Sequence, residues 1–457
     1  MTPRWGLGFV SGVFVLNTAC TVGPNYNRPA VRTPDHYYNA PANSAAAMSL
    51  GDEKWFDVFG DPVLQNLVRK ALTDNLDVRI AGNRILQAQE EVGITRAQSL
   101  PIVNGSTGFS SQRLSAFTIT DFQIQALLSW NPDFWGRYRR ATEAARDLEL
   151  AAEWSRREIL RTLIENVAIA YFSLRELDAE LEISKQTLAS RRESLALTQT
   201  LLNGGATGLL DVRQAEQLVE EAAETIPETE RQIGLQEDLI STLTGDDPHA
   251  IARGSGLVDQ PVPPEVPTGL PSRLLERRPD IQAAEKQLAA ATADIGAARA
   301  QLFPSLPLTG GGGIQSPNLG RLFTGPGAAW NFAAPLTQPI FNPALRGNVR
   351  LVEAQQQQAV LAYQQAIQTA FRQVSDALID YSKYREFREH HEKLSAAAQD
   401  AARLSDLRYR GGAASYLEVL TSQTNYFAAQ LSLTRALLSE RVTLVQLYAA
   451  LGGGWDG

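Results

Sequence analysis

Apolar positions recur along much of the chain with the spacing of long helices. Residues 136–202 contain no proline, and leucines follow a strict heptad at 174, 181, 188, 195 and 202. Sustained 3-4 spacing predicts coiled-coil packing. At about 1.5 Å per residue, a helix of roughly 65 residues would be about 100 Å long. We expect Pro227 to interrupt and kink the helix that returns.

The second half of the chain repeats the pattern of the first. Apolar residues follow 3-4 spacing again over 360–384 and 417–438. The halves also align directly, since Pro101 corresponds to Pro304 at an offset of 203 residues. An internal two-fold sequence repeat therefore organises the chain. Each copy predicts a helix, a strand pair, a long helix, a glycine-bearing turn and a returning helix.

Two segments between the helices alternate apolar and polar side chains, at about 102–130 and about 305–339. A period of two predicts strands with one apolar face. Each copy of the repeat thus supplies two strands of about ten residues, with aromatic residues near the ends, as transmembrane β-strands have. A soluble hairpin with a half-buried face fits the same alternation, which alone does not separate the two.

Four strands are too few to close a barrel, and their unpaired edges would favour aggregation. We therefore expect chains to associate through the strands, and three copies supply twelve strands under cyclic symmetry. The predicted fold class is mixed α and β. It is a transmembrane β-barrel of four strands per protomer and twelve per trimer, continued by a long α-helical coiled-coil barrel.

The N-terminus has the pattern of a targeting signal. Arg4 precedes a mostly apolar stretch, residues 5–16, and small residues then lead to Cys20, the only cysteine. This pattern predicts a signal peptide over 1–19 and lipid attachment at Cys20, whose acyl chains would add membrane affinity. Asn17 stands where such sites usually have leucine, so plain secretion is the alternative. Nothing later approaches about 18 consecutive apolar residues, as a membrane-spanning helix requires.

Composition argues against several classes of function. The net charge of −8 argues against nucleic-acid binding, and a single cysteine allows neither an intramolecular disulfide nor a cysteine cluster for a metal. His390 and His391 are neighbours on a predicted helix and lack a third ligand at suitable spacing, which favours a solvated face over a metal site. No catalytic triad or carboxylate pair is evident. We therefore predict no enzyme activity, no cofactor and no metal.

Basic residues cluster where a strand passes into a long helix, at Arg137, Arg139 and Arg140. Contact with lipid headgroups and a solvated face explain them equally well. The glycine run 310–313 lacks the Lys-Ser/Thr that follows a phosphate-binding loop, and it lies in a predicted strand. We expect it to allow close packing or a bend.

Several motifs, in order along nearly the whole chain, resemble the TolC-like outer-membrane factor family. They are Cys20-Thr21-Val22-Gly23-Pro24, Trp130-Asn131-Pro132-Asp133-Phe134-Trp135, Arg278-Pro279-Asp280-Ile281, Phe303-Pro304-Ser305 and Ala450-Leu451-Gly452-Gly453-Gly454-Trp455. The resemblance implies a homotrimer in the bacterial outer membrane, lipid-anchored and membrane-spanning, with its helices in the periplasm. It implies as partners a periplasmic adaptor, outer-membrane lipid and an inner-membrane pump of the resistance-nodulation-division type.

The repeat and the resemblance together divide the chain. The predicted parts are the signal peptide 1–19, a lipid-anchored N-terminal segment 20–75, the first repeat 76–243, an equatorial linker 244–278, the second repeat 279–451 and a tail 452–457. The resemblance places a small equatorial region in 40–75, 244–278 and the tail.

In this family the periplasmic mouth closes where the helix pairs turn. Tyr409 and Glu418 match a tyrosine and an acidic residue of the closing network, and Leu417 matches an apolar constriction. Ala414 and Thr421 depart from the family, since some members carry arginine and many carry aspartate there. The turns Gly204-Gly205-Ala206 and Gly411-Gly412-Ala413, aligned at an offset of 207 residues, are the expected adaptor contacts. A tight turn alone also explains their glycines.

We therefore predict an outer-membrane channel of a tripartite efflux pump, a passive duct for small molecules that stays closed at its helical tips until adaptor and pump engage it. The alternative is a surface-anchored coiled-coil scaffold lipoprotein. The alternating strands separate the two, because a scaffold has no need of them.

Overall fold

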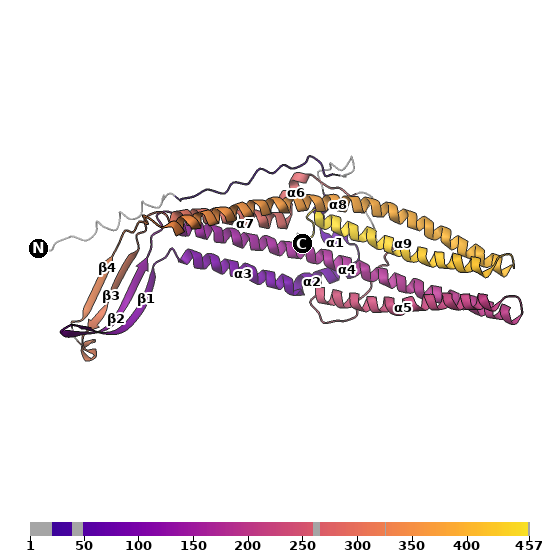
Figure 1. The fold of residues 1–457 in the computed structure, drawn as a ribbon, viewed down its shortest axis with the longest axis horizontal. Helices are drawn as coiled ribbons and strands as arrows, with labels where there is room; N and C mark the ends of the chain where they lie inside the picture. Colours follow the sequence, from indigo (N-terminus) through magenta and orange to yellow (C-terminus); the bar gives the residue numbers. More distant parts are fainter. Residues whose placement is uncertain (1–20, 39–48, 259–265, 325, 456–457) are drawn as a thin grey trace. The chain divides into compact units, whose positions relative to one another are not determined.

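The computed structural model describes residues 21–38, 49–258, 266–324 and 326–455. The predicted signal peptide and Cys20 lie outside the described residues. The elements follow in the order η1 (Leu50–Asp52), α1 (Trp55–Val58), α2 (Pro62–Asp74), α3 (Leu76–Ala97), β1 (Ile102–Leu114), β2 (Phe117–Trp130), α4 (Arg137–Asn203), α5 (Leu209–Leu243), α6 (Pro271–Arg277), α7 (Pro279–Ala300), β3 (Leu308–Ser316), η2 (Leu319–Arg321), β4 (Ala328–Ala333), α8 (Pro343–Arg410) and α9 (Tyr416–Ala450) (Figure 1).

Two compact units make up the chain, and each combines segments from both repeats. The first joins the described part of Met1–Val31 to Asn83–Trp154 and Gln282–Gln365, and it contains the sheet. The second joins the described parts of Arg32–Gly82, Ser155–Ile281 and Ala366–Gly457. Helices α3, α4, α7 and α8 contribute residues to both units, so unit boundaries do not follow repeat boundaries.

The four strands form one antiparallel sheet in chain order, β1-β2-β3-β4, as the predicted fold class requires. Only two residues, Ser115 and Ala116, connect β1 to β2, whose pairing runs from Leu114 opposite Phe117 to Ile102 opposite Ser129. Ser115 has a φ of 32°, since a two-residue hairpin turn requires positive φ.

Register places most of the large apolar residues of the four strands on one face of the sheet. Ile124 lies opposite Thr107 and Ile314, and residues directly opposite in an antiparallel pair share a face. The rings of Phe109 and Phe122 pack 4.8 Å apart on that face. The face comprises Val103, Thr107, Phe109, Phe122, Ile124, Ala126, Leu128, Trp130, Leu308, Ile314, Trp330 and Phe332. We call it the apolar sheet face.

The second strand pair is shorter than the range 305–339 that alternation favours. It ends at Ala333 on one side, because the prolines that follow lack the N–H that a ladder needs. Within β3, a side chain at Gly313 would meet the Ile124 carbonyl and the Gln125 backbone. The close approach of β2 therefore explains this glycine of the 310–313 run.

In the second unit, the leucine heptad of α4 faces α5. Leu188 packs with Val219 and Ala222, and Leu195 joins the same cluster. The expectation that Pro227 interrupts the returning helix is wrong, because α5 continues from Leu209 to Leu243 through it. Pro227 is exposed, so water can satisfy the carbonyl one turn earlier that the proline cannot pair with.

Small elements of the second unit connect the long helices. The Asp61 carboxylate caps α2 and accepts a hydrogen bond of 2.8 Å from the Tyr171 hydroxyl. The buried Arg278 guanidinium donates to the Asp280 carboxylate at 2.7 Å and to the Ala450 carbonyl at 3.2 Å. Segments expected in the equatorial region also contact one another, since the Ser255 N–H donates to the Asp61 carboxylate at 3.1 Å and Arg277 donates to the Gly452 carbonyl at 3.4 Å. Over the residues described, none of the helices combines the length and the apolar character that crossing a membrane requires.

Candidate functional site

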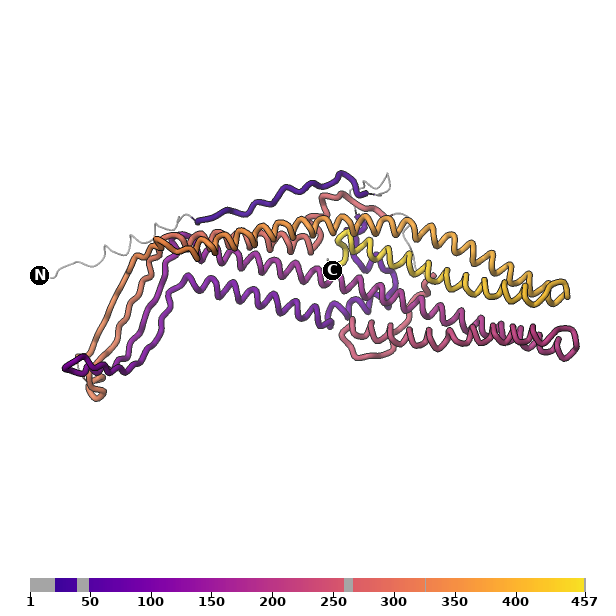
Figure 2. Tube along the Cα trace, viewed as in Figure 1, coloured from indigo at the N-terminus to yellow at the C-terminus, as the bar shows by residue number. Residues whose placement is uncertain are grey.

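Two tight turns connect the long helices to the helices that return, α4 to α5 and α8 to α9 (Figure 2). At the end of α4, the Ala206 N–H donates to the Leu201 carbonyl at 2.9 Å and the Gly205 N–H donates to the Leu202 carbonyl at 2.9 Å. This pair of bonds is a Schellman motif, which satisfies the last carbonyls of a helix.

The turn after α8 repeats the same motif. The Ala413 N–H donates to the Arg408 carbonyl at 2.8 Å, and the Gly412 N–H donates to the Tyr409 carbonyl at 2.9 Å. The left-handed residue is Gly205 in one turn and Gly412 in the other, at φ of 72° and 71°. Because αL disfavours residues with a Cβ, turn geometry explains the second glycine of each turn.

The first glycine of each turn has no such requirement. A Cβ at Gly204 would lie 3.6 Å from its nearest neighbours, and one at Gly411 would lie 3.4 Å from the Leu407 carbonyl oxygen. These are ordinary van der Waals distances, so the fold of one chain leaves the identity of Gly204 and Gly411 unexplained.

Tyr409 ends α8 and packs on Tyr416 at the start of α9. Their ring centroids are 5.3 Å apart in an edge-on arrangement with an interplanar angle of 65°. Within the part of the chain that the structure describes, the buried Tyr409 hydroxyl has no hydrogen-bond partner. Tyr416 is buried with Ala215 of α5 and Val419, so this aromatic pair joins one helical hairpin to the other.

Glu418 makes a different contact from Tyr409. Its carboxylate lies 3.2 Å from the Arg408 guanidinium, across the turn of its own hairpin. Both side chains are more than one-third exposed, so the pair contributes little to stability. Leu417, between them in sequence, is 56% exposed. The three predicted closing residues are therefore close in sequence, but each has a different environment in the structure.

A buried arginine joins the two hairpins farther from the turns. Arg191 of α4 is only 2% exposed and donates to the Leu218 carbonyl of α5 at 2.6 Å. Its guanidinium also lies 5.0 Å from the centre of the Phe427 ring of α9. Burial lowers the pKa of Arg191, since desolvation disfavours the charged form. The contact fixes α4 against both α5 and α9.

The segment that follows Cys20 lies along helices of the first unit. The Val22 N–H donates to the Trp135 carbonyl at 3.1 Å, and Arg28 forms an ion pair of 2.6 Å with Glu285 of α7. Gly23 lies directly on Gly296 of α7, with no room for a side chain on either. We call residues 21–31 the N-terminal strap.

The paired histidines lie on a helix face among partnered acids. His391 packs on Phe387 with ring centroids 4.2 Å apart, and Arg388 holds Glu392 at 2.5 Å. In the described ranges, no group of three or more His, Cys, Asp and Glu is placed to hold a metal ion.

Sequence reasoning located both turns but missed several contacts around them. Arg408, Tyr416 and Arg191 are the partners that the structure adds. The repeat offset could have drawn attention to Leu210, which corresponds to Leu417 and is also exposed. Arg191 gave no signal, because one arginine in a charged helix is not distinctive before packing is known.

Comparison with known proteins gives a consistent result over nearly the whole chain. The family model described as outer membrane efflux protein matches residues 67–246 and 270–453, one match per repeat. The probable efflux pump outer membrane protein TtgC of Pseudomonas putida is 35% identical over 456 residues, covering 97% of this chain and 94% of the relative. The cation efflux system protein CusC of Escherichia coli is 33% identical over 444 residues, covering 96% and 97%. Among solved structures, the open state of the MtrE outer membrane channel of Neisseria gonorrhoeae superposes with a TM-score of 0.87 at 31% identity, covering 95% and 99%.

Proposed function

Because this chain belongs to the outer membrane efflux protein family, we propose that it is the passive duct of a tripartite pump. Members of the family are outer-membrane channels of efflux pumps, and this chain is one of them. In the proposed assembly, a periplasmic adaptor and an inner-membrane pump of the resistance-nodulation-division type engage the duct. The energy comes from the pump, and the duct catalyses no reaction.

The observation that carries the proposal is the apolar sheet face. It extends across all four strands and is exposed in the single chain, with Trp330 84% exposed. An exposed apolar face of this size marks a surface for lipid or a partner. We propose that three copies pair β1 of one chain with β4 of the next, which closes a twelve-stranded barrel with this face toward lipid. A coiled-coil scaffold would not need such a face.

We propose that the helical turns close the periplasmic end. Tyr409, Leu417 and Glu418 would narrow the mouth when three copies of α8 and α9 converge. The exposure of Leu417, as described above, supports contacts made outside the single protomer. Release of these contacts would open the duct.

We propose the turns as the adaptor contact as well. Turn geometry accounts for Gly205 and Gly412, whereas Gly204 and Gly411 have room for a methyl group within the chain. A partner backbone that approaches closely would explain a glycine at those positions. The contact would comprise Gly204, Gly205, Ala206, Gly411, Gly412 and Ala413. We further propose that acyl chains on Cys20 anchor the N-terminal strap in the membrane.

Conductance across a planar bilayer tests the duct and its closure. The native chain should give small, rarely opening channels, and Tyr409→Ala with Glu418→Ala should give larger or more frequent openings. A matched control is Tyr384→Ala with Glu386→Ala, both on α8 away from the turn, which should behave like the native chain. Electrophoresis with and without heating checks that each sample is trimeric.

Different outcomes affect different parts of the proposal. Channels unaffected by the Tyr409 and Glu418 substitutions would leave the duct in place and show that the constriction lies elsewhere. Heat-sensitive trimers that insert but conduct in neither form would contradict the duct itself.

A further inference from the structure

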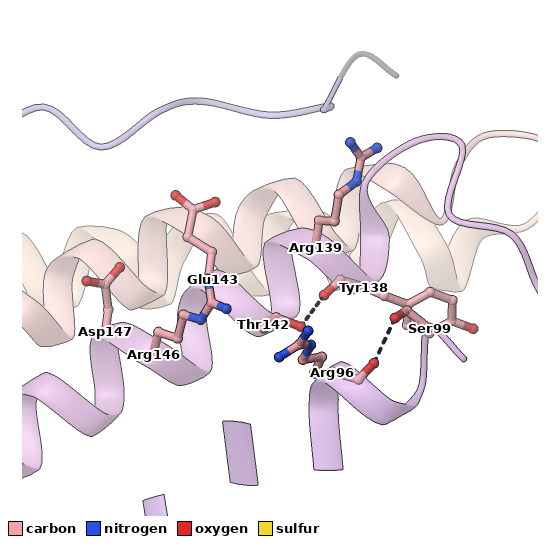
Figure 3. A pocket seen from close by; sticks show the side chains of 8 residues that line it. All are labelled: Arg96, Ser99, Tyr138, Arg139, Thr142, Glu143, Arg146 and Asp147. Carbon is pink, nitrogen blue, oxygen red and sulfur yellow. Dashed lines mark hydrogen bonds between the residues drawn. The ribbon is translucent and has the colours of Figure 1, made fainter. Parts of the chain in front are cut away.

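A charged groove of about 670 Å³ lies in the first unit, between the end of α3 and the start of α4. Arg96 lines it from α3 and Ser99 from the turn after α3. From α4, it is lined by Thr142, Glu143, Arg146 and Asp147 (Figure 3). The space is roughly twenty times that of a water molecule, enough for more than a single small ion. We call it the junction groove.

The acidic residues of the junction groove already have basic neighbours. Glu143 pairs with Arg140 at 2.9 Å, and the Asp147 carboxylate lies 4.0 Å from the Lys286 ammonium group. Burial raises the pKa of Asp147, and the nearby Lys286 opposes that rise. Both carboxylates of the groove thus already have a cationic neighbour other than Arg96 and Arg146.

Two arginines of the groove, in contrast to its acids, lack partners of opposite charge among the described residues. Neither Arg96 nor Arg146 has an acidic or hydrogen-bonding partner for its guanidinium among the described residues, and both are exposed. Figure 3 shows Arg96 extending from α3 toward α4, with its guanidinium near Thr142, whereas Arg139 points away. The groove thus presents two uncompensated guanidinium groups, which suit a bidentate oxyanion such as phosphate.

The groove lies directly beside the ends of the strands. Ser99 comes three residues before β1 begins, and its carbonyl accepts a hydrogen bond of 2.9 Å from the Trp130 indole at the end of β2. Trp135 stacks on Phe303 at the same junction, with ring centroids 4.9 Å apart. Tryptophan and other aromatic residues at strand ends mark the level of lipid headgroups.

We propose that the junction groove binds the phosphate group of a membrane phospholipid, with Arg96 and Arg146 as its ligands. The proposal rests on the proposed function, in which the strands cross the outer membrane. The groove then faces the periplasmic headgroup layer, where phospholipid phosphates are abundant. A bound headgroup would link the end of α3 to the start of α4 at the point where the sheet passes into the helices.

Native mass spectrometry of the detergent-purified trimer with added phosphatidylglycerol tests the site. The native chain should retain the lipid, and Arg96→Gln with Arg146→Gln should bind it about tenfold or more weakly, since charge-assisted hydrogen bonds to phosphate are strong. The matched control is Arg213→Gln with Arg231→Gln, two exposed arginines of α5 that pair with glutamates three residues away. The control should bind like the native chain.

Two further arms identify the occupant. Inorganic phosphate at millimolar concentration should not displace the lipid, and diacylglycerol, which lacks phosphate, should not bind in an arginine-dependent way. Equal lipid retention by the native chain and the Arg96 and Arg146 variant would overturn the proposal. Displacement by inorganic phosphate alone would show a site for a free anion and would overturn the lipid assignment.

Conductance separates failure of this site from failure of the proposed function. The Arg96 and Arg146 variant should still form heat-sensitive trimers that conduct, which also shows that it folds. A conducting native trimer without arginine-dependent lipid binding would remove the lipid site and leave the duct. A native chain that neither trimerises nor conducts would contradict the duct, and the lipid site would fall with it.

Discussion

Each helical turn has one glycine that the backbone requires and one that it does not. Gly412→Ala should therefore lower stability by about 1 kcal/mol, because alanine is strained at a φ of 71°. Gly411→Ala should leave stability unchanged or raise it slightly, since alanine reduces the freedom of the unfolded chain. The melting temperature of the purified trimer measures both, with an expected fall of roughly 2 °C for Gly412→Ala.

The other turn provides an internal repeat of this experiment. Gly205→Ala and Gly204→Ala should reproduce the difference, because the two turns share the same hydrogen bonds. Equal effects of the two substitutions within a turn would show that positive φ is not what the second glycine supplies.

Glu176 of α4 should make stability depend on pH. It is 6% exposed, and within the described residues no donor reaches its Oε1. Burial, with a smaller contribution from Glu180, raises its pKa from 4.5 to about 7, and Arg435 opposes the rise. The folded state then binds this proton more tightly than the unfolded state. The contribution of Glu176 to stability is therefore complete below pH about 4.5 and is lost as pH rises toward about 7.

Glu176→Gln should remove the loss of stability that ionisation of Glu176 causes above about pH 4.5. At pH 8 the variant should be more stable than the native chain by about 3 kcal/mol, and near pH 4.5 the two should be equal. Melting at one scan rate across this pH range measures the difference. Glu182→Gln, an exposed residue of the same helix, is the control and should follow the native profile. A native profile that Glu176→Gln leaves unchanged would show that Glu176 is hydrated in the trimer.

How far the candidate site could be predicted differs from residue to residue. The turns could be found, because repeated Gly-Gly-Ala between long apolar periodicities signals a helix end. The separate environments of Tyr409 and Glu418 could not, since they depend on which neighbours α9 and α8 bring near. The burial of Glu176 and Arg191 was equally out of reach, because charged residues on a long helix look alike until another helix covers them.

At the scale of elements, the packing of the N-terminal strap on α7 depends on one close contact, at Gly296. A Cβ at Gly296 would lie 2.7 Å from the Val22 carbonyl oxygen and 2.9 Å from the Arg140 Cγ. Gly296→Val should therefore displace the strap from α7. Chymotrypsin should then cleave after Tyr26 faster than in the native chain, because Tyr26 loses its hydrogen bond to Glu285. Mass spectrometry of the released peptide follows the cleavage.

The internal repeat supplies a matched control for this prediction. Gly93 of α3 corresponds to Gly296, and a Cβ there meets nothing within 4 Å in the described chain. Gly93→Val should leave cleavage after Tyr26 at the native rate. Faster cleavage in both variants would mean that valine perturbs the helices generally, and would argue against a specific crossing.

Helices and strands could be predicted from the sequence where one periodicity continues for many residues. They were predicted less well where prolines alter the hydrogen bonding of the backbone. The leucine heptad of α4 and the alternation of β2 located their elements, because each pattern continues for many residues. Pro227 was misleading, since an exposed proline leaves a carbonyl that water can satisfy and the helix continues. Prolines also end β4 early, and the alternation of apolar and polar residues does not reveal this effect on the length of the strand.

At the scale of the whole molecule, the two copies of the sequence repeat and the two compact units divide the chain differently. Each copy of the repeat supplies two strands to one unit and one helical hairpin to the other, so neither copy forms a unit alone. The repeat could be detected from the sequence, but this division could not, because it depends on contacts between residues about 200 positions apart. The sheet in particular needs both copies, since β2 of the first pairs with β3 of the second.

The two faces of that sheet should respond differently to the same charge. Ile124 lies on the apolar sheet face near the middle of β2, and its neighbour Gln125 lies on the opposite face. Ile124→Arg should oppose insertion by about 2–4 kcal/mol, the cost of arginine facing lipid near the bilayer midplane. It should therefore yield few heat-sensitive trimers in outer-membrane fractions. Gln125→Arg should insert normally, because its side chain would face the water-filled interior. There it should shift the reversal potential toward anion selectivity in a planar bilayer. Equal insertion of the two variants would mean that the apolar sheet face does not contact lipid, and the barrel would then have to close around a different surface.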